Sequence, residues 1–265
     1  MPVSDSLLDW FRLFRSCAIA FSGGLDSSVV AKTAAMTLGD AADAVLAYSP
    51  SSLRSEVDDA RSVAEAIPIR FRAFPSREME DAAYVANDRD RCYYCKKIRL
   101  ADICRYAAEQ GKEVVVDGSN ADDRNDYRPG RRAVQEFGIR SPLAELGITK
   151  IQVREIARRW KLPNSEKPAS PCLSTRLAYG LRITEERLRQ VETAEEFLRN
   201  QGFSPLRVRL HTDGLVRIEV VPEQILRLSE PSLRTEIAEE FRRLGFRFVS
   251  VDLQGFRSGS MNAES

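Results

Sequence analysis

The segment Phe21-Ser22-Gly23-Gly24-Leu25-Asp26-Ser27-Ser28 decides the fold of this chain. It follows a short apolar run, residues 18–21, that predicts a buried strand, and it leads into residues 27–36, which have helical periodicity. Two glycines let the backbone turn tightly, and the first turn of a helix attracts anions. The segment therefore predicts a phosphate-binding loop between the first strand and the first helix.

The side chains of this loop favour a particular phosphate chemistry. Ser22, Ser27 and Ser28 add hydroxyl donors, and Asp26 is a candidate either to hold Mg²⁺ or to orient the loop. A Walker A loop would end in Gly-Lys-Ser/Thr, and this loop has no lysine, so it suits a released pyrophosphate better than a transferred γ-phosphoryl group. We expect the ATP contacts to come from Ser22, Gly23, Gly24, Asp26, Ser27 and Ser28. The alternative is an ordinary strand-to-helix turn.

With Ser-Gly-Gly-x-Asp-Ser directly after a buried strand, the chain resembles the PP-loop superfamily, the N-type ATP-pyrophosphatases. That superfamily includes NAD synthetase, the ATP domain of GMP synthetase and tRNA thiolation enzymes. The resemblance implies that an oxygen of the substrate is adenylated and that pyrophosphate leaves.

Short apolar runs alternate with helical segments through the first part of the chain. Strands are expected at residues 18–21, 44–48, 69–74 and 114–117, and helices at 27–36, 56–66, 96–110 and 149–160, with Thr149 as an N-cap. This alternation predicts an α/β fold with a parallel sheet covered on both faces.

The pattern changes after a loop rich in Pro, Ser and Ala, residues 163–177. Helices are then expected at residues 185–200 and 232–244, and strands at 206–211, 216–220 and 247–253. This arrangement predicts a small α+β domain. We place the PP-loop domain at residues 1–175 and the substrate-binding domain at 176–265.

Composition narrows the class of protein. The 265 residues are 43% hydrophobic and 30% charged, which is typical of a globular protein, and the net charge of +1 argues against a nucleic-acid partner. The longest apolar runs are too short to cross a membrane, and the N-terminus has no signal-peptide pattern, so we expect a cytoplasmic protein. Five cysteines in such a compartment favour metal binding, redox chemistry or burial over disulfides.

A second polar loop, residues 118–130, follows the expected strand at 114–117. Ligands of an open parallel sheet collect at the carboxyl ends of its strands, so this loop is expected near the phosphate loop. Asp122, Asp123 and Asp126 are therefore candidate contacts of Mg²⁺ or substrate, and Arg128 is a candidate partner of a phosphate or a carboxylate. The alternative is a solvated loop whose aspartates favour turns.

Three cysteines are candidate ligands of a metal. Cys92 and Cys95 form a C-x-x-C motif before the expected helix at 96–110, and Cys172 lies in the interdomain loop. Three thiolates match an iron–sulfur cluster with one open iron, whereas structural zinc needs a fourth ligand. The motif alone also fits half a zinc site or a redox pair. Cys17 and Cys104 have core-like surroundings.

Four further segments narrow the resemblance: residues 91–97, 125–130, 167–180 and 251–261. With them, the chain resembles the LarE family of sulfur transferases, which help to build the nickel-pincer nucleotide of lactate racemase. The resemblance implies adenylation of a carboxylate on pyridinium biscarboxylic acid mononucleotide and its conversion to a thiocarboxylate. It implies ATP, Mg²⁺ and a sulfur donor as cofactors and partners, and we expect a homo-oligomer.

The resemblance leaves two sources of sulfur open. Some members sacrifice a cysteine, and by our alignment the donor position is Pro171 here, with Cys172 as its neighbour. Other members hold a [4Fe–4S] cluster on three cysteines, and Cys92, Cys95 and Cys172 match that group. We favour the cluster, because the C-x-x-C motif would otherwise have no role.

Arg207 and Arg209 alternate on the expected strand at 206–211, so both point to one face. Two adjacent guanidinium groups suit a phosphate monoester, although a solvated basic face is the alternative. The family pattern implies that Arg207, Arg209 and Thr175 hold the substrate phosphate and that Glu195 contacts a divalent metal.

Three rival functions stay open at this point. A tRNA thiolation enzyme is weakened by the near-neutral charge, and an NAD-synthetase-like amidation has no evident source of ammonia. A non-catalytic iron–sulfur or nucleotide carrier would not release pyrophosphate.

Overall fold

The computed structural model describes residues 3–125, 129–167, 171–257 and 260–262. The chain divides into two units: unit 1 comprises residues 1–84 and 89–170, and unit 2 comprises residues 85–88 and 171–265. Within the described residues, no helix combines the length and the apolar character that a membrane span requires.

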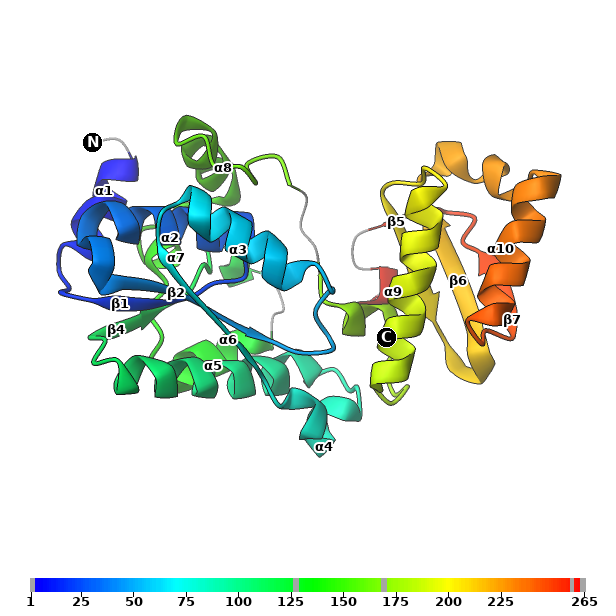
Figure 1. The fold of residues 1–265 in the computed structure, drawn as a ribbon, viewed down its shortest axis with the longest axis horizontal. Coiled ribbons are helices and arrows are strands. Elements are labelled where there is room, and N and C mark those ends of the chain that lie inside the picture. Colours follow the sequence, from blue (N-terminus) through cyan, green and yellow to red (C-terminus); the bar gives the residue numbers. More distant parts are fainter. Residues whose placement is uncertain (1–2, 126–128, 168–170, 258–259, 263–265) are drawn as a thin grey trace. The chain divides into compact units, whose positions relative to one another are not determined.

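Unit 1 contains a four-stranded parallel sheet, as the sequence predicts (Figure 1). Its strands are β1 (Cys17–Ala20), β2 (Ala42–Tyr48), β3 (Arg70–Pro75) and β4 (Val114–Val116), in the order β3-β2-β1-β4. In the register, Ile19 of β1 lies opposite Ala44 of β2 and Val116 of β4. β1 is therefore a central strand, and the phosphate loop follows its carboxyl end.

Helices cover both faces of this sheet (Figure 1). They are α1 (Val3–Phe11), α2 (Leu25–Leu38), α3 (Glu56–Ala66), α5 (Arg91–Glu109), α6 (Gly130–Glu136), α7 (Pro142–Glu145) and α8 (Lys150–Arg159), while the short helix α4 (Ala82–Val85) precedes α5. Alternate side chains of β1 divide between two cores: Ile19 packs with α1, α2, α3, α7 and α8, whereas Ala18 packs with α5 and α6. The doubly covered sheet explains why its central strands are continuously apolar.

One helix start differs from the sequence prediction, and one helix cap confirms it. α5 begins at Arg91 rather than at residue 96, so Cys92 and Cys95 lie within the helix and not before it. Thr149 is the N-cap of α8, as expected, and its side chain forms a reciprocal capping box with Gln152.

Unit 2 is a small α+β unit. Its elements are α9 (Glu185–Asn200), β5 (Leu206–Leu210), β6 (Leu215–Val220), α10 (Pro231–Arg243) and β7 (Phe248–Val251). β5 and β6 are antiparallel, and β7 lies parallel to β6. Val208 pairs with Ile218 on the apolar face, while Arg207 pairs with Glu219 on the opposite, polar face. Short 3₁₀ turns lie at Gly39–Ala41, Glu78–Glu80, Asp122–Asn125, Leu173–Arg176, Thr212–Gly214, Pro222–Gln224, Leu226–Ser229 and Ser260–Asn262.

Unit 2 also takes in residues 85–88, from the middle of the chain. Asn87 is fully buried, and its side-chain amide donates to the carbonyls of Ala178 and Leu181, both at 2.8 Å. The amide of Ile183 donates to the carbonyl of Val85 at 2.8 Å. The division after residue 170 lies near the boundary predicted at 175, but nothing in the sequence pattern indicated the inserted segment.

Candidate active site

The phosphate loop turns directly into α2. Gly24 is the N-cap, and the amide of Ser28 already donates to the carbonyl of Gly24 at 3.0 Å. The hydroxyls of Ser27 and Ser28 donate to the same carbonyl at 3.0 and 2.8 Å, and the amide of Gly24 donates to Ser22 Oγ at 3.3 Å. The first amides of α2 have no acceptor within the helix, so they are oriented to bind an anion.

Two residues outside the loop brace it. Asn164 is buried, and its side-chain amide donates to the carbonyl of Gly23 and to Ser28 Oγ, both at 2.8 Å. Gly118, at the end of β4, passes so close to α2 that a Cβ atom there would lie 2.7 Å from the amide nitrogen of Ser27. Only glycine allows the second loop to approach the phosphate loop at this point.

Asp26 forms an ion pair that the sequence did not indicate. Its Oδ2 accepts from Lys150 Nζ at 2.5 Å, and Lys150 is the first residue of α8. Its Oδ1 is buried and has no hydrogen-bond partner among the described residues. A buried carboxylate oxygen without a donor is costly, and Mg²⁺ prefers oxygen ligands of this kind. The residue therefore fits the magnesium role expected of it.

A cavity of about 310 Å³ opens beside the loop. Ser22, Gly24, Asp26 and Ser27 line its polar end, and residues 45–47 of β2 line an apolar wall. Leu100 and Ile103 of α5 add to that wall, and Gly118, Ser119 and Asp123 lie at the carboxyl end of β4. The combination of an apolar slot and an anion-binding loop suits a purine nucleotide.

Lys96 brings a second positive charge to this cavity. It pairs with Asp117 at 2.9 Å, and Asp117 also accepts from the hydroxyls of Ser119 and Ser141 at 2.7 and 2.6 Å. Burial raises the pKa of Asp117, but Lys96 and the two serines outweigh it and hold that pKa below its usual value. Asp117 therefore stays ionised and holds Lys96 at the wall of the cavity.

Arg99 is the other cation of the cavity wall and is more firmly held than Lys96. Its Nε and Nη2 donate to the fully buried Glu78 at 2.9 and 2.6 Å, and Nη2 also donates to Ser51 at 3.0 Å. Its Nη1 has no hydrogen-bond partner among the described residues. Because one edge of the guanidinium is locked, the other edge is a preorganised donor for a ligand in the cavity.

The described part of the second loop places Asp122 and Asp123 differently. Asp122 accepts from the amide of Lys150 at 2.8 Å, and Asp123 accepts from the amide of Asn120 at 2.9 Å. Of these two aspartates, only Asp123 lines the cavity. Asp126 and Arg128 lie outside the described residues, so their substrate contacts stay predictions.

The candidate cluster cysteines belong to different units. Cys92 and Cys95 lie in the first turn of α5 in unit 1, and Cys172 precedes the turn Leu173–Arg176 in unit 2. All five cysteines are thiols, with Cys92 exposed and Cys95 and Cys172 half-buried. Among the described residues, no group of three or more His, Cys, Asp or Glu side chains is arranged to hold a metal ion. The thiols have the chemistry an iron–sulfur cluster requires, and the cluster stays a prediction.

In unit 2, Arg209 and Thr175 lie together. Arg209 Nη1 donates to the carbonyl of Thr175 at 3.1 Å, and its Nε donates to Glu219 at 3.1 Å. Glu219 is fully buried and also accepts from Arg217 at 3.4 Å. Two of the predicted phosphate ligands thus share one site, although the role of each stays a prediction.

Glu195 has two arginine neighbours, and its expected contact with a divalent metal stays a prediction. Arg176 donates to both of its oxygens, at 2.9 and 3.1 Å, and Arg199 donates at 3.3 Å. Burial raises the pKa of Glu195, but Arg176 outweighs it and the net shift is downward. Arg176 also donates to the carbonyls of Pro171 and Cys172, at 2.6 and 3.1 Å. It therefore fixes the backbone on which the third cysteine lies.

Arg207 lies among more cations than anions. Among the described residues it has no ion pair, and its only hydrogen bond goes to the carbonyl of Leu206 at 2.6 Å. Burial, then the charges of Arg176, Arg209 and Arg199, lower its pKa to about 10, although the charge of Glu195 opposes them. A half-buried guanidinium among like charges is a site that an anion would stabilise.

Several of these residues escaped the sequence analysis. Lys96 lies inside the Cys-Lys-Lys segment and so carried a signal, but Lys150, Arg99 and Asn164 did not stand out from ordinary helix and loop residues. Their roles depend on contacts with residues far away in the chain, such as the 124 positions between Asp26 and Lys150.

The parallel sheet and this loop define a PP-loop enzyme that uses ATP, and comparison with known proteins supports that class. The sequence profile of the NAD synthase family matches residues 12–173. An uncharacterized protein of Synechocystis is 43% identical over 258 residues, covering 97% of this chain and 96% of that protein. An uncharacterized protein of Methanocaldococcus jannaschii is 30% identical over 241 residues, 91% of this chain and 90% of its own.

A third relative carries a functional name. The pyridinium-3,5-bisthiocarboxylic acid mononucleotide synthase of Lactiplantibacillus plantarum is 39% identical over 246 residues, which cover 92% of this chain and 88% of that enzyme. The chain belongs to the LarE family of PP-loop, ATP-dependent sulfur transferases. The predicted fold class and family are thereby confirmed.

Proposed function

We propose that this enzyme adenylates a carboxylate of pyridinium-3,5-biscarboxylic acid mononucleotide and replaces one of its oxygens with sulfur, in nickel-pincer nucleotide biosynthesis. The observation that carries the proposal is the identity to the L. plantarum synthase, whose product is the corresponding bisthiocarboxylic acid mononucleotide. The two sites support it: a phosphate loop with an apolar slot suits ATP, and the arginines of unit 2 suit the phosphate of a mononucleotide.

In the first step, a carboxylate oxygen of the substrate attacks the α-phosphorus of ATP. A new P–O bond forms, the bond to the β-phosphate oxygen breaks, and pyrophosphate leaves with the electron pair. The amides of α2, that of Ser27 among them, and the hydroxyl of Ser22 bind the departing charge, and Lys150 and Lys96 balance it. Asp26 Oδ1 would hold Mg²⁺, which neutralises phosphate charge when bound.

In the second step, sulfide attacks the acyl carbon of the adenylate, and AMP leaves. We assign Cys92, Cys95 and Cys172 to a [4Fe–4S] cluster, which when bound would leave one iron open for an external sulfide. Arg176 supports this step from the protein side, because its hydrogen bonds to the carbonyls of Pro171 and Cys172 hold the third thiol in place.

The products of ATP test the proposal. Purified enzyme given ATP, sulfide and the biscarboxylic acid mononucleotide should form AMP and pyrophosphate, and mass spectrometry should show one substrate oxygen replaced by sulfur. ADP and phosphate as main products would contradict the first step. Pyrophosphate release without sulfur insertion would contradict the second.

The source of sulfur is tested separately. Cys92→Ser, Cys95→Ser and Cys172→Ser should each lower both iron content and sulfur transfer in anaerobically purified protein, whereas pyrophosphate release should persist. Cys104→Ser is the matched control, since this half-buried thiol packs against the α5–α6 core. Single-turnover activity of iron-free protein, with dehydroalanine at residue 172, would establish a sacrificial cysteine instead.

A further inference from the structure

The segment that follows β7 is tied to the sheet of unit 2. The amide of Asp252 donates to the carbonyl of Ile218 at 2.9 Å, and the amide of Phe256 donates to the carbonyl of Val220 at 2.8 Å. At Gly255, where φ is +72°, a Cβ atom would lie only 2.6 Å from the carbonyl oxygen of Val220. Glycine therefore lets residues 252–257 run close along β6, and we name residues 252–257 and 260–262 the C-terminal strap.

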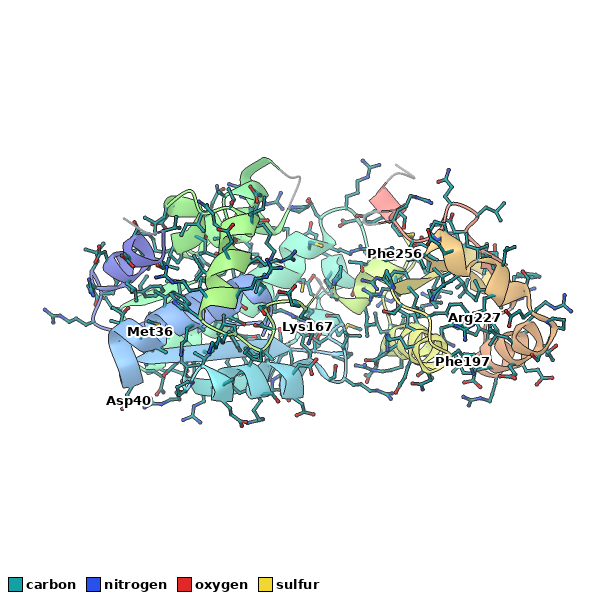
Figure 2. The ribbon with its side chains drawn as sticks, turned by 90° about the horizontal axis from the view of Figure 1, so that it is seen from above. Met36, Asp40, Lys167, Phe197, Arg227 and Phe256 are labelled. Atoms are coloured by element: carbon teal, nitrogen blue, oxygen red, sulfur yellow. The ribbon has the colours of Figure 1, made fainter. Side chains whose placement is uncertain are left out.

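Side chains of the strap reach the arginines. The ring of Phe256, labelled in Figure 2, lies 5.3 Å from the guanidinium carbon of Arg207. Ser260 Oγ donates to Glu219 Oε1 at 2.7 Å, and Met261 Sδ accepts from Arg217 Nη2 at 3.5 Å. Ser260 and Met261 are 7% and 5% exposed, so these contacts are shielded from water.

The type of each contact matters. An aromatic ring attracts a guanidinium through its face and uses none of its N–H donors, so Phe256 stabilises Arg207 without neutralising it. A carboxylate in the same place would compete with a phosphate for those donors. Ser260 does not contact these arginines through an ion pair but acts through Glu219. Its hydrogen bond holds Glu219, and Glu219 in turn forms ion pairs with Arg209 and Arg217.

We infer that the C-terminal strap positions the arginines for the phosphate monoester of the substrate, with Phe256 orienting Arg207 and Ser260 orienting Arg209 through Glu219. This inference rests on the proposed function and adds two positioning residues to it. It also gives a role to the segment 251–261, which the sequence marked as characteristic of the family but to which no chemistry was assigned.

Binding of two probes to the full-length protein tests the inference. The probes are nicotinic acid mononucleotide, a pyridinium carboxylate with the same phosphate monoester, and nicotinic acid riboside, which lacks the phosphate. Phe256→Leu keeps the apolar bulk but removes the ring, so we expect mononucleotide affinity to fall about three- to tenfold while riboside affinity is unchanged. Phe256→Trp should restore mononucleotide affinity to within about twofold of the wild type.

Two further variants complete the set. Ser260→Ala should weaken mononucleotide binding about two- to tenfold, since Glu219 loses a donor. Phe248→Leu is the matched control, because Phe248 also faces an arginine, Arg247 at 5.5 Å, but lies on β7 away from the Glu219 network. It should leave both affinities unchanged.

Failure of the inference and failure of the proposed function would give different binding results. If wild-type protein binds the mononucleotide no better than the riboside, the proposed phosphate site itself is wrong. If the wild type prefers the mononucleotide and Phe256→Leu keeps that preference with an unchanged melting temperature, the strap has no positioning role. Equal loss of both probes in Phe256→Leu and Phe256→Trp would mean a purely structural role and would also overturn the inference.

Discussion

At the scale of single residues, two charged side chains of the candidate sites, Asp26 and Arg207, have incomplete sets of partners. Asp26 has a lysine on one oxygen and none of the described donors on the other, whereas Arg207 faces an aromatic ring and forms no ion pair with a described residue. Both are incompletely satisfied in the protein alone. Groups of this kind are costly to keep unless a ligand completes them.

Lys150 is expected to matter for the chemical step. Lys150→Met removes the cation that pairs with Asp26 of the phosphate loop, so pyrophosphate release should fall about 100- to 1000-fold, the range for loss of one electrostatic contact. A coupled pyrophosphate assay checks this. Lys167→Met is the control, since Lys167 pairs with Asp59 at 2.9 Å in a similar exposed ion pair and should leave the rate unchanged. Equal rates in both variants would show that Lys150 only anchors α8.

Replacing either arginine of β5 should weaken mononucleotide binding, but only one of the two replacements should lower the stability of the protein. Either Arg207→Ala or Arg209→Ala should weaken mononucleotide binding by about 1.5–3 kcal/mol, with ATP binding unchanged. Arg209→Ala leaves the buried Glu219 without its 3.1 Å partner and should lower the melting temperature, whereas Arg207→Ala removes a cation that is repelled by three other arginines as well as attracted by Glu195, and should not. Calorimetric titration and thermal unfolding measure the two effects. An equal loss of ATP binding would indicate a folding defect.

At the scale of elements, α5 carries more of the site than its sequence indicates. One face supplies the apolar wall of the cavity through Leu100 and Ile103, and its first turns supply Cys95, Lys96 and Arg99. Arg99 is anchored outside the helix, on Glu78 and on the serines that follow β2. The Arg99–Glu78 ion pair therefore helps to hold the helix at the cavity, together with the pair of Lys96 and Asp117.

Breaking that ion pair should give a pH-dependent loss of stability. Glu78→Gln leaves Arg99 without its charged partner, so the free energy of unfolding at pH 7 should fall by about 3–5 kcal/mol. Burial raises the pKa of Glu78, but Arg99 and nearby serines outweigh it and hold that pKa below the usual 4.5. The contribution is thus complete above pH 4.5 and disappears as the pH falls through the lowered pKa, so the gap between variant and wild type should narrow in acid.

Denaturant unfolding at several pH values checks this difference. Glu166→Gln is the control, because Glu166 and its partner Arg158 are 68% and 56% exposed and their pair should contribute little. A gap that stays constant from pH 7 to acid would contradict an ionised Glu78.

The sequence predicts those features that depend on neighbouring residues and misses those that depend on residues far apart in the chain. Strands β1, β2 and β4 were predictable as largely apolar runs, β3 from the alternation of its apolar residues, and the phosphate loop because its glycines and serines are contiguous. The start of α5 was predicted too late, since Arg91 to Cys95 show no apolar periodicity. Asn164 and Lys150 could not be predicted, because their partners Gly23 and Asp26 lie more than a hundred positions away.

At the scale of the whole molecule, unit 2 is assembled from two separate stretches of chain. The short one, residues 85–88, is held by the amide of Asn87 and by the backbone of Val85. Because Asn87 is fully buried, its two hydrogen bonds form without competition from water.

Asn87→Ala should therefore destabilise unit 2. It leaves the carbonyls of Ala178 and Leu181 without this donor, at a cost of about 1–3 kcal/mol. Amide hydrogen exchange should show faster exchange in β5 and β6 than in β1 and β2. Asn200→Ala, at the exposed end of α9, should show no such difference. Uniformly faster exchange across both sheets would contradict a local role for Asn87.

Because residues 85–88 belong to unit 2, dividing the chain into two fragments has a specific consequence. A chain cut between residues 170 and 171 yields an N-terminal fragment that still carries Val85 and Asn87, and a C-terminal fragment that carries Ala178, Leu181 and Ile183. The hydrogen bonds between these residues then join two separate polypeptides. Co-expressed from split genes, the two fragments should associate, whereas the C-terminal fragment produced alone would lack residues 85–88 of its own unit.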